Sequence, residues 1–150
     1  MNPISAINNF VINHFKNDDL VNTISLVKTI EIDINISNIY MLVNIDMVEA
    51  PIDEQTISVN FVITALQQRD TYNKKTDSKL LEDTNYIDNM AETHFVLTRF
   101  MNVLRQQNNE DNIEVISVGT PRSLRQFNRS NLDGWQMNIE LQIPNLIPSC

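Results

Sequence analysis

The stretch that decides the fold reads Gly134-Trp135-Gln136-Met137-Asn138-Ile139-Glu140-Leu141-Gln142-Ile143-Pro144-Asn145. Its apolar and polar residues alternate, which is the period of a strand with one dry face and one solvated face. We expect Gly134 to open this strand. Pro144 should close it, because proline has no amide proton to donate to a neighbouring strand. The rest of the chain must therefore supply a cover for the dry face and partners for the strand's edges.

Two stretches have helical periodicity and are the candidates for that cover. Residues 3–15 predict a short helix, with Asn2 as the N-cap and Pro3 at the first helical position. Residues 84–107 predict a long helix that is capped by Asp83 or Thr84. Its expected apolar stripe comprises Ile87, Met90, His94, Leu97, Met101 and Leu104, widened by Ala91, Phe95 and Val103. Such a stripe needs a partner surface, and the dry face of the sheet is the available one.

Four further strands are expected from alternating or β-branched runs at about 23–36, 39–48, 56–68 and 113–118. In the first run, Ile30, Ile32, Ile34 and Ile36 alternate with charged and polar residues, as sheet edges often do. The second and third runs form a long β-hairpin with its bend at 50–54. Strands this long either project past the sheet and pair with a neighbour or are simply core strands, and length alone leaves both readings open.

The order of these elements lacks β-α-β alternation and so predicts a mainly antiparallel sheet. The expected fold is α+β, with a long β-hairpin, one long helix packed across one face and a short N-terminal helix. A chain of 150 residues favours a single domain over 1–150, with polar loops at 70–83 and 122–133 and an extended tail at 144–150. The core anchors should be Trp135, Met137, Ile139, Leu97, Met101 and Leu104. Full burial of the indole would make Trp135→Ala cost about 3–5 kcal/mol.

Charge and cysteine content restrict the possible classes of protein. The net charge of −8 argues against a protein that holds duplex DNA by neutralising phosphates. The single cysteine, Cys150, cannot form an internal disulfide, which suits a reducing compartment or a virion interior. We expect no signal peptide, because polar residues interrupt every apolar run in 1–15, and no membrane span.

Candidate chemistry is sparse. His14 and His94 fall on helical apolar stripes and read as residues at the boundary of the core, since a zinc site needs about four close ligands. The two glycines cannot form a phosphate-binding loop. The acidic pairs Asp18/Asp19, Asp53/Glu54 and Glu82/Asp83 lie in polar turns and read as solvated carboxylates rather than as general acids or bases. We therefore expect no catalytic residue, no cofactor and no metal, and a protein that is not an enzyme.

Arg122, Arg125 and Arg129 stand out as an acid-free basic segment in an acidic chain. They read equally well as a solvated loop or as a contact surface. Identical acidic copies repel one another unless positive groups lie at their contacts, so we expect these arginines to meet carboxylates of a neighbouring subunit, with DNA phosphate as the competing ligand. The hypothesised interface also includes Tyr72, Lys74, Lys75, Asp53 and Glu54.

Four segments carry a family resemblance: 39–46 (Ile-Tyr-Met-Leu-Val-Asn-Ile-Asp), 80–84 (Leu-Leu-Glu-Asp-Thr) before a helix, 133–135 (Asp-Gly-Trp) and 143–145 (Ile-Pro-Asn). Together with the long hairpin, they resemble the tail-terminator-like and ring proteins in the neck of tailed bacteriophages, including crAss-like phages. The resemblance covers nearly the whole chain in its order of elements. It carries no catalytic motif.

The resemblance implies a structural virion protein that is assembled in the host cytoplasm. Copies of the protein would form a ring in the head-to-tail connector. The ring would contact other portal, neck and tail proteins and surround DNA without sequence-specific binding, with no membrane involved. One alternative is a small acidic phage protein that binds and inhibits a host protein. A small enzyme is the other, and it would require a cleft with perturbed titratable groups.

Overall fold

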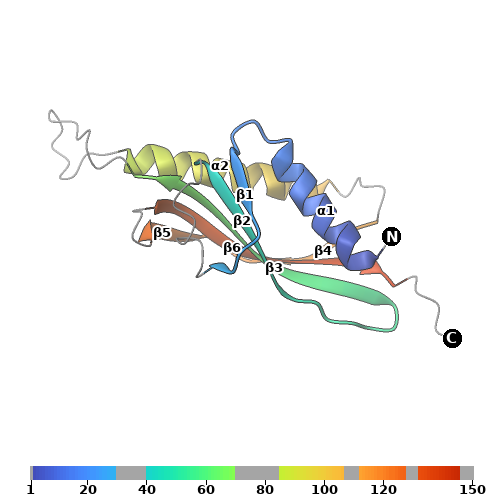
Figure 1. Ribbon diagram of the computed structural model, residues 1–150. Coiled ribbons are helices and arrows are strands. Elements are labelled where there is room, and N and C mark those ends of the chain that lie inside the picture. Colours follow the sequence, from blue (N-terminus) through green and yellow to red (C-terminus); the bar gives the residue numbers. More distant parts are fainter. Residues whose placement is uncertain (1, 30–39, 70–84, 107–111, 128–131, 146–150) are drawn as a thin grey trace, which may run out of the picture.

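The computed structural model describes residues 2–29, 40–69, 85–106, 112–127 and 132–145. In chain order the elements are α1 (Pro3–Lys16), β1 (Thr23–Ser25), β2 (Leu42–Glu49), β3 (Thr56–Gln68), α2 (Tyr86–Arg105), β4 (Glu114–Val118), β5 (Arg122–Phe127) and β6 (Leu132–Pro144). The described strands form one six-stranded sheet, and both helices lie on the same side of it (Figure 1). The α+β class expected from the sequence is confirmed.

The sheet has the order β1-β2-β3-β6-β4, with β5 also paired to β6. The short β1 runs parallel to β2, and every other pairing is antiparallel, as expected. The longest pairing joins β3 to β6 in continuous register from Thr56↔Pro144 to Gln68↔Leu132. β3 is paired along its whole length and is a core strand. β2 is buried only over Leu42–Ile45, whereas Met47–Glu49 and the turn at 51–55 are exposed, so this end of the hairpin extends past the core.

Residues 122–127 form a strand, so the loop expected over 122–133 is wrong for this part. β4 pairs with the second half of β6 and β5 with the first half, end to end along one edge. The amide of Gly119, between them, donates to Asn138 O at 2.6 Å. β6 is much longer than β4, and its remaining backbone groups at Leu132–Gln136 need partners, which β5 supplies.

The core lies between the sheet and the two helices. Facing residues on β3 and β6 point to the same side, for example Phe61 opposite Ile139 and Ile63 opposite Met137. They pack with Phe15 of α1 and with Leu97, Phe100 and Leu104 of α2 in one buried cluster. Four of the six expected anchors are buried, while Trp135 and Met101 are only partly buried. The indole packs against the core and reaches the rim of α2, where its Nε1–H donates to Met90 O at 2.8 Å, so the condition of full burial for Trp135 is not met.

The buried face of α2 is rotated from the expected stripe. It comprises Asn89, Met90, Thr93, Val96, Leu97, Phe100 and Leu104. Ile87, Ala91, His94, Phe95 and Val103 are exposed instead. Asn89 and Thr93 can occupy the inner face because both are hydrogen-bonded: Asn89 Nδ2 donates to Gln68 O, and Thr93 Oγ1 donates to Asn89 O. An apolar pattern alone misses such satisfied polar residues.

Several expected boundaries change. α1 begins as predicted, with Asn2 Oδ1 accepting from the amide of Ile4. The N-cap of α2 is Asn85 rather than Asp83 or Thr84, which lie outside the described residues, and Asp88 is in its first turn as expected. The first strand covers only Thr23–Ser25, and the alternating run from Ile30 to Ile36 lies outside the described residues. The loop at 70–83 and the tail beyond Asn145 lie outside as well.

Gly134 lies inside β6, not at its start, and it is required there by a close approach of two backbones. A Cβ at this position would lie 1.8 Å from Ala65 O and 2.9 Å from Ala65 C of the neighbouring strand β3. Backbone atoms of a central strand cannot move aside without breaking the β3–β6 ladder. At Gly119 the closest atom to such a Cβ, Asn138 O, is 3.2 Å away, so a small shift is enough.

We predict that Gly134→Ala destabilises the protein by at least about 3 kcal/mol, because the added methyl overlaps the backbone of β3. The matched control Gly119→Ala should cost about 1 kcal/mol or less. Urea unfolding followed by far-UV circular dichroism measures both. Equal stability of the two variants would contradict the close approach at Gly134.

Candidate subunit interface

The structure places two of the three predicted arginines, and it separates them. Arg122 and Arg125 are exposed on β5, at the free side of the described sheet edge. Arg122 lies opposite Gln136, on the sheet face away from the helices. Arg125 extends to the helix side, where its Cζ is 4.5 Å from the ring centroid of Tyr86. The two guanidinium groups therefore lie on opposite sides of the sheet edge. Arg129, Tyr72, Lys74 and Lys75 lie outside the described residues.

Arg125 belongs to a cluster that we name the arginine corner: Arg69, Tyr86, Arg125 and Asp133. Arg69 donates from Nε and from its second terminal nitrogen to the two carboxylate oxygens of Asp133, both at 2.8 Å. Its Cζ is also 4.9 Å from the ring centroid of Tyr86. Asp133 pairs with Arg69, and neither Arg122 nor Arg125 pairs with a carboxylate among the described residues.

Hydrogen bonds at the end of β3 hold the arginine corner in place. The carbonyl of Gln68 accepts from Nδ2 of Asn85 and of Asn89, which ties the start of α2 to the sheet. The side chain of Asp133 is 0% exposed and that of Arg69 is 9% exposed. A bidentate, desolvated pair of this kind fixes orientation. The ring of Tyr86 is thereby held as a platform under Arg125.

We predict that Asp133→Ala costs about 3–5 kcal/mol of stability, because it leaves the Arg69 guanidinium buried without a counter-charge. The double variant Arg69→Met/Asp133→Leu should recover most of this loss, since no charge is then left unpaired. Chemical denaturation of both variants measures the difference. A double variant as unstable as Asp133→Ala would show that the pair matters for a reason other than compensated charge.

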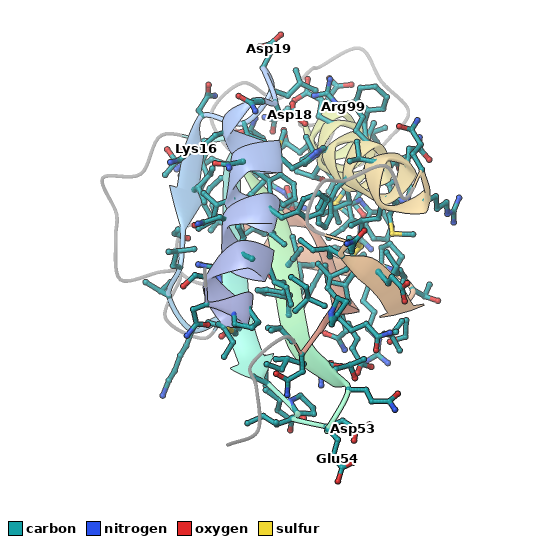
Figure 2. The ribbon with its side chains drawn as sticks, turned by 90° about the vertical axis from the view of Figure 1, so that its right-hand side faces the viewer. Lys16, Asp18, Asp19, Asp53, Glu54 and Arg99 are labelled. Carbon is teal, nitrogen blue, oxygen red and sulfur yellow. The ribbon has the colours of Figure 1, made fainter. Side chains whose placement is uncertain are left out.

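The second candidate surface is the hairpin tip, residues 47–55. Its apolar side chains are exposed: Met47 by 44%, Val48 by 55% and Ile52 by 80%. Glu49, Asp53 and Glu54 are exposed among them, and the tip contains no Lys or Arg. Figure 2 shows Asp53 and Glu54 at one extremity of the molecule, far from Asp18, Asp19 and Arg99.

The hairpin tip is held in one shape by backbone hydrogen bonds. Asp53 N donates to Thr56 O at 2.9 Å, and Ser58 N donates to Pro51 O at 3.0 Å. The segment after β6 adds two bonds, because Asn145 donates from its amide to Gln55 O and from Nδ2 to Asp53 O. Because the backbone of this turn is already ordered, contact between Ile52 and a partner would cost little further backbone entropy.

Asp18 is not the solvated carboxylate that the sequence predicts. It is buried beside α2 and forms an ion pair with Arg99, while its Oδ1 also accepts from the amide of Leu20. His14 lies next to this pair, with its ring 4.9 Å from that of Phe100 and 5.0 Å from that of Phe15. Burial lowers the pKa of His14 below its ordinary 6.5, opposed by the charge of Asp18 and assisted by that of Arg99. Asp19, Asp53 and Glu54 are exposed, as expected.

We predict that His14 makes the protein less stable as the pH falls. At pH above 6.5 the imidazole is neutral in both states; below it, the unfolded chain takes up a proton more readily than the folded one, whose pKa is lowered. Stability should drop between about pH 7.5 and about pH 5.5, where carboxylates stay mostly ionised. His14→Gln should reduce this drop. Urea unfolding at the two pH values is the measurement. An undiminished drop in His14→Gln would contradict the assignment.

The described surface also has hollows on both sides of the sheet. One groove, of about 490 Å³, lies on the sheet face away from the helices, with Glu49 and Glu140 in its lining. Another, of about 390 Å³, lies between the helices, where Phe10, His14 and Val103 contribute to its wall. Within the described ranges, no group of three or more His, Cys, Asp or Glu side chains is placed to hold a metal ion. None of the described helices is long and apolar enough to cross a membrane.

Sequence reasoning found the charges of this candidate interface but missed its apolar and aromatic parts. Ile52 was assigned only to the bend, although a lone large apolar residue in a polar turn was a usable signal. Arg69 follows the end of β3, Tyr86 begins α2 and Asp133 lies in β6, so no local pattern joins them. Comparison with known proteins adds no assignment: no protein-family model matches the chain, and no curated protein is significantly similar to it.

Proposed function

We propose that this protein is a structural subunit without catalytic activity that forms an oligomeric ring in the head-to-tail neck of a tailed phage. The sequence resemblance to tail-terminator-like and ring proteins provides the family context. In this proposal the protein resides in the virion, contacts portal-side and tail-side proteins, and surrounds DNA that passes through without sequence-specific contact. An acidic lumen suits such passage, because it repels phosphate instead of holding it.

One observation carries the proposal. The hairpin tip presents an 80% exposed isoleucine between carboxylates on a hydrogen-bonded turn, and the arginine corner lies at the other end of the molecule. Ile52 is not alone there, because Met47 and Val48 of the same hairpin tip are exposed too, and apolar side chains gathered at one end of a molecule support an interaction site. Two different surfaces at opposite ends are what a heterologous contact requires, and heterologous contacts close into rings when the rotation permits.

The same hairpin tip also favours a second candidate function, that of a small acidic protein that docks on a basic host protein and inhibits it. A surface of exposed carboxylates around an apolar residue would suit such a partner. The two functions differ in where the protein is found. The ring subunit stays in the finished particle in several copies, whereas an inhibitor acts as a monomer in the infected cell.

We predict that phage particles made without this protein contain filled heads and separate tails that do not join, because the neck lacks one ring. Electron microscopy of the lysate measures the fraction of joined particles, and supplying the protein in trans should restore it. Normal joining in the absence of the protein would refute the proposal.

A further inference from the structure

The hairpin tip and the arginine corner complement each other in charge. The hairpin tip carries three exposed carboxylates and no cation, and none of these carboxylates pairs with a described cation. At the arginine corner, Arg69 and Asp133 neutralise each other, which leaves the charge of Arg125. Asp88, nearby in the first turn of α2, is exposed and does not pair with Arg125.

The two surfaces also match in their apolar parts. Ile52 is the most exposed large apolar side chain described, at 80%. Ile87, the neighbour of Tyr86 at the start of α2, is 65% exposed. Contact between these two side chains would remove both from water. Tyr86 and Ile87 both lie in the first turn of α2, and Arg125 stacks on the Tyr86 ring, so the start of α2 carries an apolar and a cationic contact point.

We infer that the hairpin tip of one copy docks on the arginine corner of the next copy, with Glu54 or Asp53 on the Arg125 guanidinium and Ile52 against Ile87. This inference rests on the proposed function and specifies the contact that would build the ring. Arginine in a stacked position retains its planar fork for a carboxylate, so less side-chain freedom is lost when the pair forms.

Charge excludes the symmetric arrangements of the same two surfaces. Two tips in contact would bring Asp53 and Glu54 against their own copies, and two corners would bring the Arg125 side chains together. Only tip against corner pairs unlike charges, and this contact is head-to-tail. Figure 1 shows that the turn between β2 and β3 and the β5 strand lie at opposite ends of the molecule, so each copy can contact two neighbours at once.

Two single variants test the direction of the contact. Ile52→Asp removes the apolar contact and adds an acid to the tip, and Arg125→Glu reverses the charge of the corner. Each should weaken self-association, the first roughly 10- to 100-fold and the second roughly 10-fold. Both side chains are exposed, so the fold should persist. Asp19→Lys and Lys28→Glu change exposed charges outside both surfaces and should assemble like the wild type.

An equimolar mixture of the two variants gives the decisive result. The intact tip of the Arg125→Glu copy can bind the intact corner of the Ile52→Asp copy, while their altered surfaces are both acidic and repel. The mixture should therefore form dimers and stop, as measured by sedimentation velocity. Combining Glu54→Arg with Arg125→Glu in one chain should restore larger assemblies. Variants that assemble like the wild type, or a mixture that stays monomeric, would overturn the inference.

Copies that associate only when a neighbouring ring is present would stay monomeric in solution. Disulfide trapping inside assembled particles tests the same contact for such copies. Cys150→Ser removes the chain's only thiol. Adding Ile52→Cys and Ile87→Cys should then give a ladder of cross-linked copies under mild oxidation, and either cysteine alone should give no more than dimers. Particles that join head and tail but show no ladder would refute this contact while leaving the ring function standing. Normal joining without the protein would refute both.

Discussion

The antiparallel pairing of β3 with β6 is the interaction on which the rest of the structure depends. These two strands run together over their full described length, and the facing pairs from Ile57↔Ile143 to Ala65↔Trp135 form the floor of the core. Both helices cover this floor, and β2 and the β4–β5 edge extend it on either side. The two backbones approach so closely that any side chain at position 134 would overlap Ala65 of β3. A local backbone constraint thus fixes the position of the central ladder.

The same pairing sets the distance between the two candidate contact surfaces. At one end of β3, Arg69 directly follows the strand and pairs with Asp133 at the corresponding end of β6. At the other end, Asn145 follows β6 and holds the hairpin tip through Gln55 and Asp53. The central ladder therefore acts as a rigid spacer between an acidic, apolar end and a cationic end. A spacer with unlike ends is suited to repeated head-to-tail contact.

Buried polar groups join elements that are far apart in the sequence. Asp133 and Asp18 each neutralise an arginine from a distant part of the chain, and Asn89 ties α2 to the last carbonyl of β3. Each group fixes how one element sits on another. Desolvated pairs of this kind are weak sources of net stability but penalise alternative arrangements, because separation would leave a charge buried alone.

The sequence by itself determined the strand at 134–143, the hairpin arms, both helices and the α+β class, because alternation and helical periodicity are local and strong. It also marked Arg122, Arg125, Asp53 and Glu54 as exposed charges. Only the tertiary structure decided that residues 122–127 form a strand. Their hydrogen-bonding partners are backbone groups of β6, and no hydrophobic pattern within 122–127 indicates that pairing. The tertiary structure likewise decided which side of α2 is buried, because Asn89 and Thr93 are satisfied by bonds that no periodicity reveals. The arginine corner was also decided by the tertiary structure alone. Its members are up to 64 positions apart in sequence and meet only when β3, β5, β6 and α2 have packed.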